Sequence, residues 1–144
     1  MPGAVGRVLV VDDSQVIRQL IKVNLELDGF EVVTAADGAE CLETVHRFRP
    51  DVITLDLVMP RLDGTRTVGR LRVDPRTAAI PLVLVSASAG DGAPAGIDAL
   101  LAKPFEPAEL VGLVRMLCDR GRADAVRGVK PPVGGAPVSR TLAP

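Results

Sequence analysis

The sequence predicts an α/β protein with a doubly wound, mainly parallel sheet. Short apolar runs rich in β-branched residues alternate with longer segments in which apolar residues recur at helical spacing. Strands that alternate with helices are joined by right-handed crossovers, and these place helices on both faces of the sheet. The 144 residues, 47% of them hydrophobic, are enough for one domain with its own core.

The first part of the chain carries three expected strands and two expected helices. Ser14 is placed as the N-cap of the first helix, and Gly29 as its C-terminal cap. The turn Asp37-Gly38 precedes a second helix, which is expected at about residues 39–47. The strands are expected at residues 7–11, 30–35 and 52–56.

The second part continues the alternation with one irregularity. A helix is expected at about residues 65–72, strands at 80–86 and 99–102, and a last helix from Pro107, which suits a first helical turn. The segment 87–98 holds three glycines and a proline where a fourth helix belongs. Both residue types disfavour helix interiors, so this helix is expected to be shortened or replaced by a loop.

Composition predicts the extent of the folded domain, its cellular compartment and the classes of partner. Residues 1–120 are expected to form the folded domain, and residues 121–144, rich in glycine, proline and arginine, a disordered tail. Two cysteines without a secretory signal, and no apolar run long enough to cross a membrane, predict a cytoplasmic protein. The formal net charge of −1 gives no sign of a nucleic-acid or membrane partner, and neither is expected.

Polar side chains follow four of the expected strands. Asp12 and Asp13 follow the first, Asp56 ends the third, Ser86 ends the fourth and Lys103 follows the fifth. A lone aspartate at a strand end often only opens a turn, but here several strands end in the same way. The carboxyl ends of parallel strands share one edge of the sheet, so these groups should converge. Adjacent carboxylates repel unless a cation lies between them, and hard divalent cations prefer oxygen ligands.

Four short motifs lie at these strand ends: Asp12-Asp13-Ser14, Asp56-Leu57-Val58-Met59-Pro60 with Asp63-Gly64, Ser86-Ala87, and Lys103-Pro104-Phe105. In their order and separations, the chain resembles the receiver domain of two-component response regulators over about residues 6–118. The resemblance implies a five-stranded parallel sheet in the flavodoxin-like order 2-1-3-4-5, with strands one and three adjacent at the crevice.

The resemblance also implies a function, that of a single-domain response regulator in a phosphorelay. Asp56 is then the phosphoacceptor for a sensor histidine kinase or a histidine phosphotransfer protein, and the chain catalyses only its own phosphorylation and dephosphorylation. Mg²⁺ or Mn²⁺ is expected to be held by Asp12, Asp13, Asp56 and the main-chain carbonyl of Val58. Lys103 and Ser86 are expected to contact the phosphoryl oxygens.

Partner contacts are expected beside this site. The resemblance places docking at Gln15, Ile17, Arg18, Pro104 and Phe105. The downstream target is expected to be a protein that the sequence does not identify. At position 100, where related receivers carry tyrosine or phenylalanine, this chain has leucine, so their aromatic switch is not expected to operate.

Two other functions are compatible with parts of the pattern. A receiver-like adaptor that works without phosphorylation is favoured by the irregular segment 87–98 and disfavoured by the complete acidic set with Lys103. A small metal-dependent phosphatase acting on other substrates would need a separate acid–base residue, and the motifs supply none.

Overall fold

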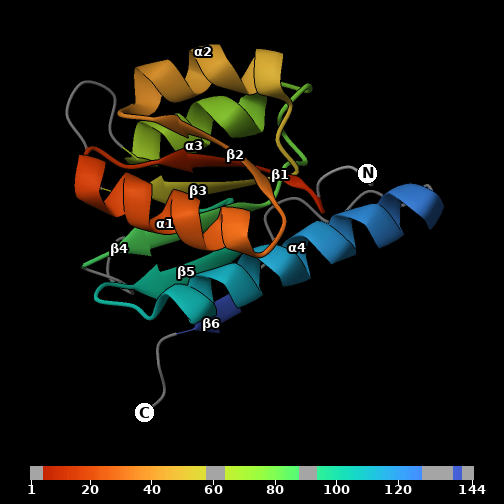
Figure 1. The fold of residues 1–144 in the computed structure, drawn as a ribbon. Coiled ribbons are helices and arrows are strands. Elements are labelled where there is room, and N and C mark those ends of the chain that lie inside the picture. The colour runs from red at the N-terminus through yellow and green to blue at the C-terminus, as the bar shows by residue number, and fades with distance from the viewer. Residues whose placement is uncertain (1–4, 58–63, 88–93, 128–137, 141–144) are drawn as a thin grey trace.

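A parallel sheet forms the centre of the molecule (Figure 1). The computed structural model describes residues 5–57, 64–87, 94–127 and 138–140, with only the main chain for 122–127 and 138–140. The expected strand order 2-1-3-4-5 is confirmed, and a sixth strand adds to it at the edge beside the fifth. The strands are β1 Arg7–Val11, β2 Glu31–Ala35, β3 Val52–Asp56, β4 Leu82–Ser86, β5 Ala99–Ala102 and β6 Val138–Arg140.

Helices cover both faces of the sheet, as the alternation predicts (Figure 1). They are α1 Gln15–Leu27, α2 Gly38–Phe48, α3 Gly64–Val73 and α4 Pro107–Arg127. One buried cluster joins the sheet to α1 and α4, and a second joins it to α2 and α3. Val8 and Val10 face the first cluster, while Leu9 and Val11 face the second. The central strands are therefore continuous apolar runs because both of their faces are buried.

The ends of α1 match the expected caps. The Ser14 hydroxyl accepts a hydrogen bond from the main-chain N–H of Ile17 at 3.2 Å. Gly29 has a φ of 97°, a left-handed conformation that glycine adopts without a Cβ clash. The next residue, Phe30, donates its N–H to the carbonyl of Leu25 at 3.1 Å, and the chain turns into β2.

Two elements reach into residues 121–144, the part expected as a tail. α4 continues to Arg127, past the expected domain boundary at residue 120. A Cβ at Gly121 would meet no atom within 4 Å, so this glycine marks no close approach that ends the helix. β6 also falls in this part of the chain and pairs in parallel with β5, with Val138 opposite Ala99.

No helix stands between β4 and β5 among the residues that the structure describes there, 87 and 94–98. Residues 88–93, half of the expected irregular segment, lie outside the described part. Gly96 has a φ of 95°, and a Cβ there would lie 3.1 Å from the Cγ of Arg72. The approach to β5 is therefore a tight turn packed against the last turn of α3.

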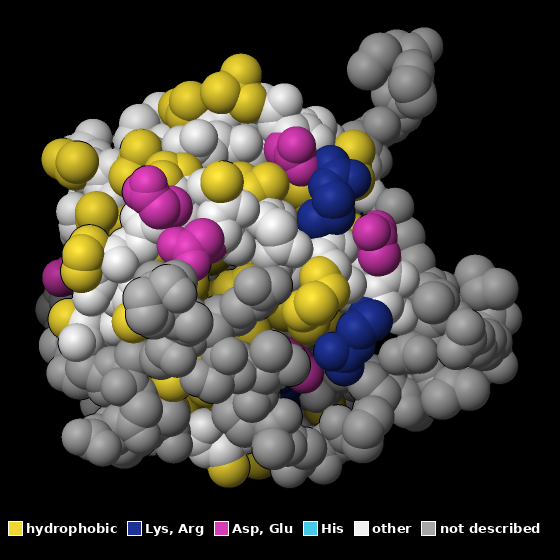
Figure 2. Space-filling model, turned by 90° about the horizontal axis from the view of Figure 1, so that it is seen from below, with side chains coloured by type: hydrophobic (Ala, Val, Ile, Leu, Met, Phe, Trp, Pro, Cys, Tyr) yellow, Lys and Arg dark blue, Asp and Glu magenta, His cyan; other side chains and the backbone are white. Residues whose placement is uncertain are grey.

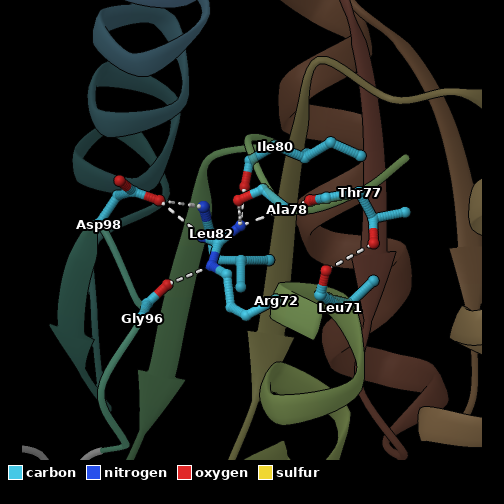
Figure 3. Close-up of polar contacts among 8 residues, drawn as sticks. All are labelled: Leu71, Arg72, Thr77, Ala78, Ile80, Leu82, Gly96 and Asp98. Atoms are coloured by element: carbon cyan, nitrogen blue, oxygen red, sulfur yellow. Dashed lines mark hydrogen bonds and ion pairs between the residues drawn. The ribbon is translucent and has the colours of Figure 1, made fainter. Parts of the chain in front are cut away.

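Arg72 holds this turn in place (Figure 3). Its Nε donates to the carbonyl of Gly96 at 2.7 Å, and its Nη2 lies 3.0 Å from the Asp98 carboxylate. Its Nη1 donates to the carbonyls of Ala78 at 2.9 Å and Ile80 at 2.8 Å. Burial lowers the pKa of the Arg72 guanidinium, and the adjacent Asp98 carboxylate opposes that shift. One cation thus connects α3, the loop before β4 and the turn before β5.

Asp98 completes this connection. The Oδ2 atom that binds Arg72 also accepts the main-chain N–H of Leu82, the first residue of β4, at 2.8 Å. The N–H of Asp98 in turn donates to the carbonyl of Leu82 at 2.9 Å. These two hydrogen bonds therefore fix the start of β5 beside the start of β4.

We predict that Arg72→Met lowers the free energy of unfolding by about 2–4 kcal/mol. Methionine keeps an apolar stem but leaves the carbonyls and the Asp98 carboxylate without their donor. Urea unfolding measures the change. Arg70→Met is the matched control, because Arg70 is exposed on the same helix, and it should change stability by less than about 0.5 kcal/mol. Equal losses in the two variants would contradict the role given to Arg72.

Candidate functional site

Three carboxylates meet at the carboxyl edge of the sheet. Asp12 and Asp13 directly follow β1, and Asp56 is the last residue of the neighbouring β3. One oxygen from each lies within 4.8 Å of the others. Asp12 and Asp56 are buried, with 2% and 7% of their surfaces exposed, whereas Asp13 is exposed. The strand order alone brings these groups together from two distant parts of the sequence.

The Lys103 ammonium lies between the two buried carboxylates. Its Nζ is 3.3 Å from Asp12 Oδ2 and 3.4 Å from Asp56 Oδ1. Lys103 follows β5, and its main-chain N–H donates to the carbonyl of Ser86 at 3.0 Å. Two buried anions are costly unless they are paired, and this cation pairs with both of them.

Ser86 reaches the same edge from β4. It is the last residue of that strand, 2% exposed, and its partner across the sheet is Ala102. The residue after it, Ala87, is small and exposed. The five side chains expected at strand ends therefore all lie at the edge of the sheet where the sequence predicts the site. They are Asp12, Asp13, Asp56, Ser86 and Lys103.

Main-chain contacts fix the position of Asp12. Its Oδ1 accepts the N–H of Ser14 at 2.9 Å, which holds the carboxylate against the start of α1. Its carbonyl accepts a hydrogen bond from Arg18 Nη1 at 2.7 Å. Arg18 was considered only as a docking residue, and its bond to Asp12 had no signal in the sequence.

Gly64 has a structural role that its place in a motif did not reveal. A Cβ at Gly64 would lie 2.6 Å from the carbonyl oxygen of Asp56 and 2.7 Å from Leu57 Cα. Its N–H donates to the carbonyl of Leu57 at 2.9 Å. Only glycine lets α3 begin this close to the main chain that carries Asp56. Val58, whose carbonyl was expected as a metal ligand, lies outside the described residues.

The acidic group fits a hard divalent cation. Carboxylate oxygens are the ligands that Mg²⁺ and Mn²⁺ accept in proteins. Two of the three carboxylates are buried and share a single ammonium, so negative charge exceeds positive charge within the group. Exposed Asp13 leaves this side of the group open to solvent.

The expected docking residues differ in exposure. Gln15 and Pro104 are exposed, while Ile17 and Phe105 are partly buried against the core cluster under α1 and α4. The exposed apolar side chains of α1 are different ones. They form a stripe at helical spacing that we call the α1 stripe: Val16, Leu20, Val23 and Leu27. Val16 and Leu20 belong to the apolar helical spacing of this segment, and the structure exposes both of them.

The surface near β5 carries no aromatic switch residue. Leu100, at the position where related receivers have an aromatic ring, is buried in the cluster under α2 and α3.

The face seen in Figure 2 has acidic and basic side chains among hydrophobic ones, so the side chains drawn there form no field of one charge. In the part of the chain that the structure describes, no helix has the length and apolar character needed to span a bilayer.

Several known proteins with similar sequences are described as transcriptional regulators. PrrA of Mycobacterium tuberculosis, a transcriptional regulatory protein, is 44% identical over 117 residues, which are 79% of this chain and 50% of PrrA. RpaA of Synechocystis, described as a DNA-binding dual master transcriptional regulator, is 38% identical over 119 residues, 79% of this chain and 49% of RpaA. The chain thus spans about half the length of these curated relatives.

These relatives correct one expectation. Nucleic acid was excluded as a partner because the net charge is near zero. That exclusion is wrong, because RpaA is a DNA-binding protein by its description. The net charge of −1 describes this chain only, which matches about half of the length of RpaA. It carries no information on a function that a relative of twice the length performs.

One solved structure has the same fold and contains a magnesium ion, the kind of metal expected for this chain. The receiver domain of the sensor histidine kinase PA1611 from Pseudomonas aeruginosa is 29% identical, with a TM-score of 0.74 over 82% of this chain and 99% of that one. In that structure a magnesium ion is coordinated in the active-site cleft. The family model of the response regulator receiver domain matches residues 8–115, which include every strand end described above. The chain therefore belongs to the response regulator receiver domain family of two-component signalling.

Proposed function

We propose that Asp56 accepts a phosphoryl group from a sensor histidine kinase or a histidine phosphotransfer protein, in a reaction that needs Mg²⁺ or Mn²⁺. The observation that carries this proposal is the grouping of three carboxylates within 4.8 Å, with the Lys103 ammonium 3.3 and 3.4 Å from two of them. A purely structural cluster would not place like charges together at the cost of their repulsion.

Asp56 is the nucleophile in this proposal. A carboxylate oxygen of Asp56 forms a bond to phosphorus while the phosphorus–nitrogen bond of a phosphohistidine breaks. The electron pair of that bond stays on the imidazole nitrogen, which then takes up a proton. Lys103 neutralises charge on the phosphoryl oxygens, and the Ser86 hydroxyl donates to one of them. The chain then catalyses only its own phosphorylation and its hydrolytic reversal.

Asp12, Asp13 and Asp56 hold the divalent cation, with the Val58 carbonyl as a further ligand. The bound ion supplies electrostatic stabilisation of the charge on the transferring group. Exposed Asp13 provides the ligand that the ion meets first from solvent. Asp12 is fixed by Ser14 and Arg18, so its carboxylate need not reorganise when an ion binds.

The α1 stripe is the proposed docking surface for the helical phosphodonor, together with Gln15 and Pro104. Four exposed apolar side chains on one helix suit an amphipathic partner helix. The stripe begins at Val16, close to the N-terminal end of α1 where Asp12 and Ser14 lie. In this proposal Ile17 and Phe105 lie beneath the docking surface and support it, because they pack against the core.

Transcription is the proposed class of output. The observation that favours it is the description of both relatives as transcriptional regulators, each about twice as long as the match. In this proposal the receiver residues control, through phosphorylation, a DNA contact that other residues make. A receiver-like adaptor without phosphorylation is less well supported, because the acidic group and Lys103 are complete.

We predict that acetyl phosphate with Mg²⁺ adds one phosphoryl group to the wild-type chain and none to Asp56→Asn. The asparagine side chain is not a carboxylate nucleophile, so labelling should fall below detection. Intact mass measures the product, and removal of Mg²⁺ with a chelator should abolish labelling of the wild type. Asp119→Asn, an exposed aspartate on α4, is the control and should label normally. Full labelling of Asp56→Asn would reject the assignment.

The second prediction concerns the metal. Asp13→Asn should weaken Mg²⁺ binding about tenfold or more, which corresponds to about 1.4 kcal/mol of binding free energy. The metal-free variant should also unfold at a higher temperature, because one of three mutually repelling charges is gone. Calorimetry and thermal unfolding with and without Mg²⁺ measure both effects. Unchanged Mg²⁺ affinity would remove Asp13 from the ligand set.

The third prediction tests the α1 stripe. Val16 is 77% exposed, so Val16→Ser should fold normally but weaken docking of the phosphodonor about tenfold through lost apolar burial. Transfer from the cognate kinase should slow, while labelling by acetyl phosphate stays unchanged. Val73→Ser is the matched control, since Val73 is 82% exposed on α3. If both variants slow transfer equally, or if acetyl phosphate labelling also slows, the docking role fails.

A further inference from the structure

A pocket of about 420 Å³ lies at the amino edge of the sheet. Its position is set by the end of α2, by Pro50 just before β3, and by the loop that leads to β4. Asp56 lies at the other end of β3, so this pocket is separate from the carboxylate group. The lining residues are Val45, His46, Arg49, Pro50, Arg76, Thr77 and Ile80.

The lining suits a flat apolar body. Val45 and Ile80 contribute aliphatic surface, and Pro50 contributes a ring. The Thr77 hydroxyl points away from any ligand, because it donates to the carbonyl of Leu71 at 2.6 Å. Guanidinium groups stack on aromatic faces, and Arg49 and Arg76 both line this pocket. A volume of this size is typical of sites for small organic ligands.

The charges at the rim favour an anion. Arg76 is bound to the Asp74 carboxylate, with its Nε 3.2 Å from Asp74 Oδ1 and its Nη2 3.0 Å from Asp74 Oδ2. These bonds to Arg76 lower the pKa of Asp74, and the carboxylate's charge is thereby satisfied. His46 Nε2 lies 3.5 Å from the same Oδ2 and adds a positive charge when protonated.

Of the basic side chains that line the pocket, that of Arg49 remains available to an anion. Its side chain makes no hydrogen bond or ion pair with any residue in the described part of the chain. The partial negative charge at the C-terminal end of α2 opposes an anion, but the Arg49 N–H already caps the carbonyl of Val45 at 3.0 Å. Arg49 also has a φ of 53°, a left-handed conformation in which glycine would be favoured.

We propose that this pocket binds a small aromatic anion, with its ring against Pro50 and Ile80 and its charged group on Arg49. The proposal does not depend on phosphoryl transfer to Asp56. The ligand would rest on Thr77 and Ile80, in the loop whose carbonyls bind Arg72. Through Arg72 that loop is joined to Gly96 and Asp98, and so to the start of β5. An occupant would therefore strengthen the contacts that hold the short connection between β4 and β5.

The test is an NMR titration of the full ¹⁵N-labelled chain with naphthalene-1-sulfonate. Saturable shifts are expected at the amides of His46, Arg49, Thr77 and Ile80, and none at Asp12 or Asp13. Mg²⁺ should leave the affinity unchanged, because its proposed ligands lie at the other edge of the sheet. Uncharged 1-naphthalenemethanol should bind at least about fivefold more weakly, because it cannot pair with Arg49.

Arg49→Gln should weaken the sulfonate about five- to tenfold, through loss of one charge-assisted contact. Arg47→Gln is the matched control, since Arg47 is exposed in the last turn of α2, two residues before Arg49, does not line the pocket and changes the net charge equally. Shifts scattered over the surface, equal affinity for the uncharged analogue, or equal weakening by the two variants would each overturn the proposal. Unchanged spectra of the two free variants, apart from the substituted positions, exclude misfolding as the cause.

Discussion

The arrangement of this domain depends on the repulsion among Asp12, Asp13 and Asp56 and on the Lys103 ammonium, which offsets part of it. Two of these carboxylates are buried, so each needs a cation or a set of donors to replace its lost hydration. Lys103 serves both, so its side chain must reach from the end of β5, beyond β4, to the carboxylates at the ends of β3 and β1. The position of β5 is therefore an electrostatic requirement as well as a matter of sheet pairing.

That requirement explains the importance of Arg72. In a doubly wound fold, the connection before the last strand normally includes a helix that packs on the sheet. Here the described residues of that connection form a turn at Gly96, and the contact with the sheet is made by one guanidinium and one carboxylate. Side-chain hydrogen bonds to carbonyls act together with the apolar burial of Ile97 and Leu100 in fixing β5, and with it Lys103. A polar clamp depends on geometry at a few atoms, whereas a packed helix spreads its contacts over many.

The strands and the strand-end residues could be predicted, because buried parallel strands are continuous apolar runs and their carboxyl ends share one edge. The sheet order came from the resemblance to receiver domains. Arg72 could not be predicted, since its sequence neighbourhood is like that of Arg70 and its partners are distant in sequence. β6 could not either, because it lies in a glycine- and proline-rich segment without periodicity. Val16 shows a third limit: the helical period identifies apolar positions, but only the tertiary structure decides which of them find a partner.

β3 runs between the edge of the sheet that carries the acidic group and the edge that carries the pocket. Its carboxyl end presents Asp56 to an acidic group that demands a cation, and its amino end is preceded by Pro50 in a pocket with basic side chains at its rim. Between them the strand is buried along its full length, so it has little freedom to move by itself. Communication between the two edges would instead run beside it, through the loop that lines the pocket, the Arg72 guanidinium and the turn into β5. Each step of that route is a hydrogen bond of 2.7 to 3.0 Å, from the Ile80 carbonyl to Arg72 and from Arg72 to Gly96 and Asp98. The residues at its far end, Gly96 and Asp98, lie at the start of β5, the strand that Lys103 follows.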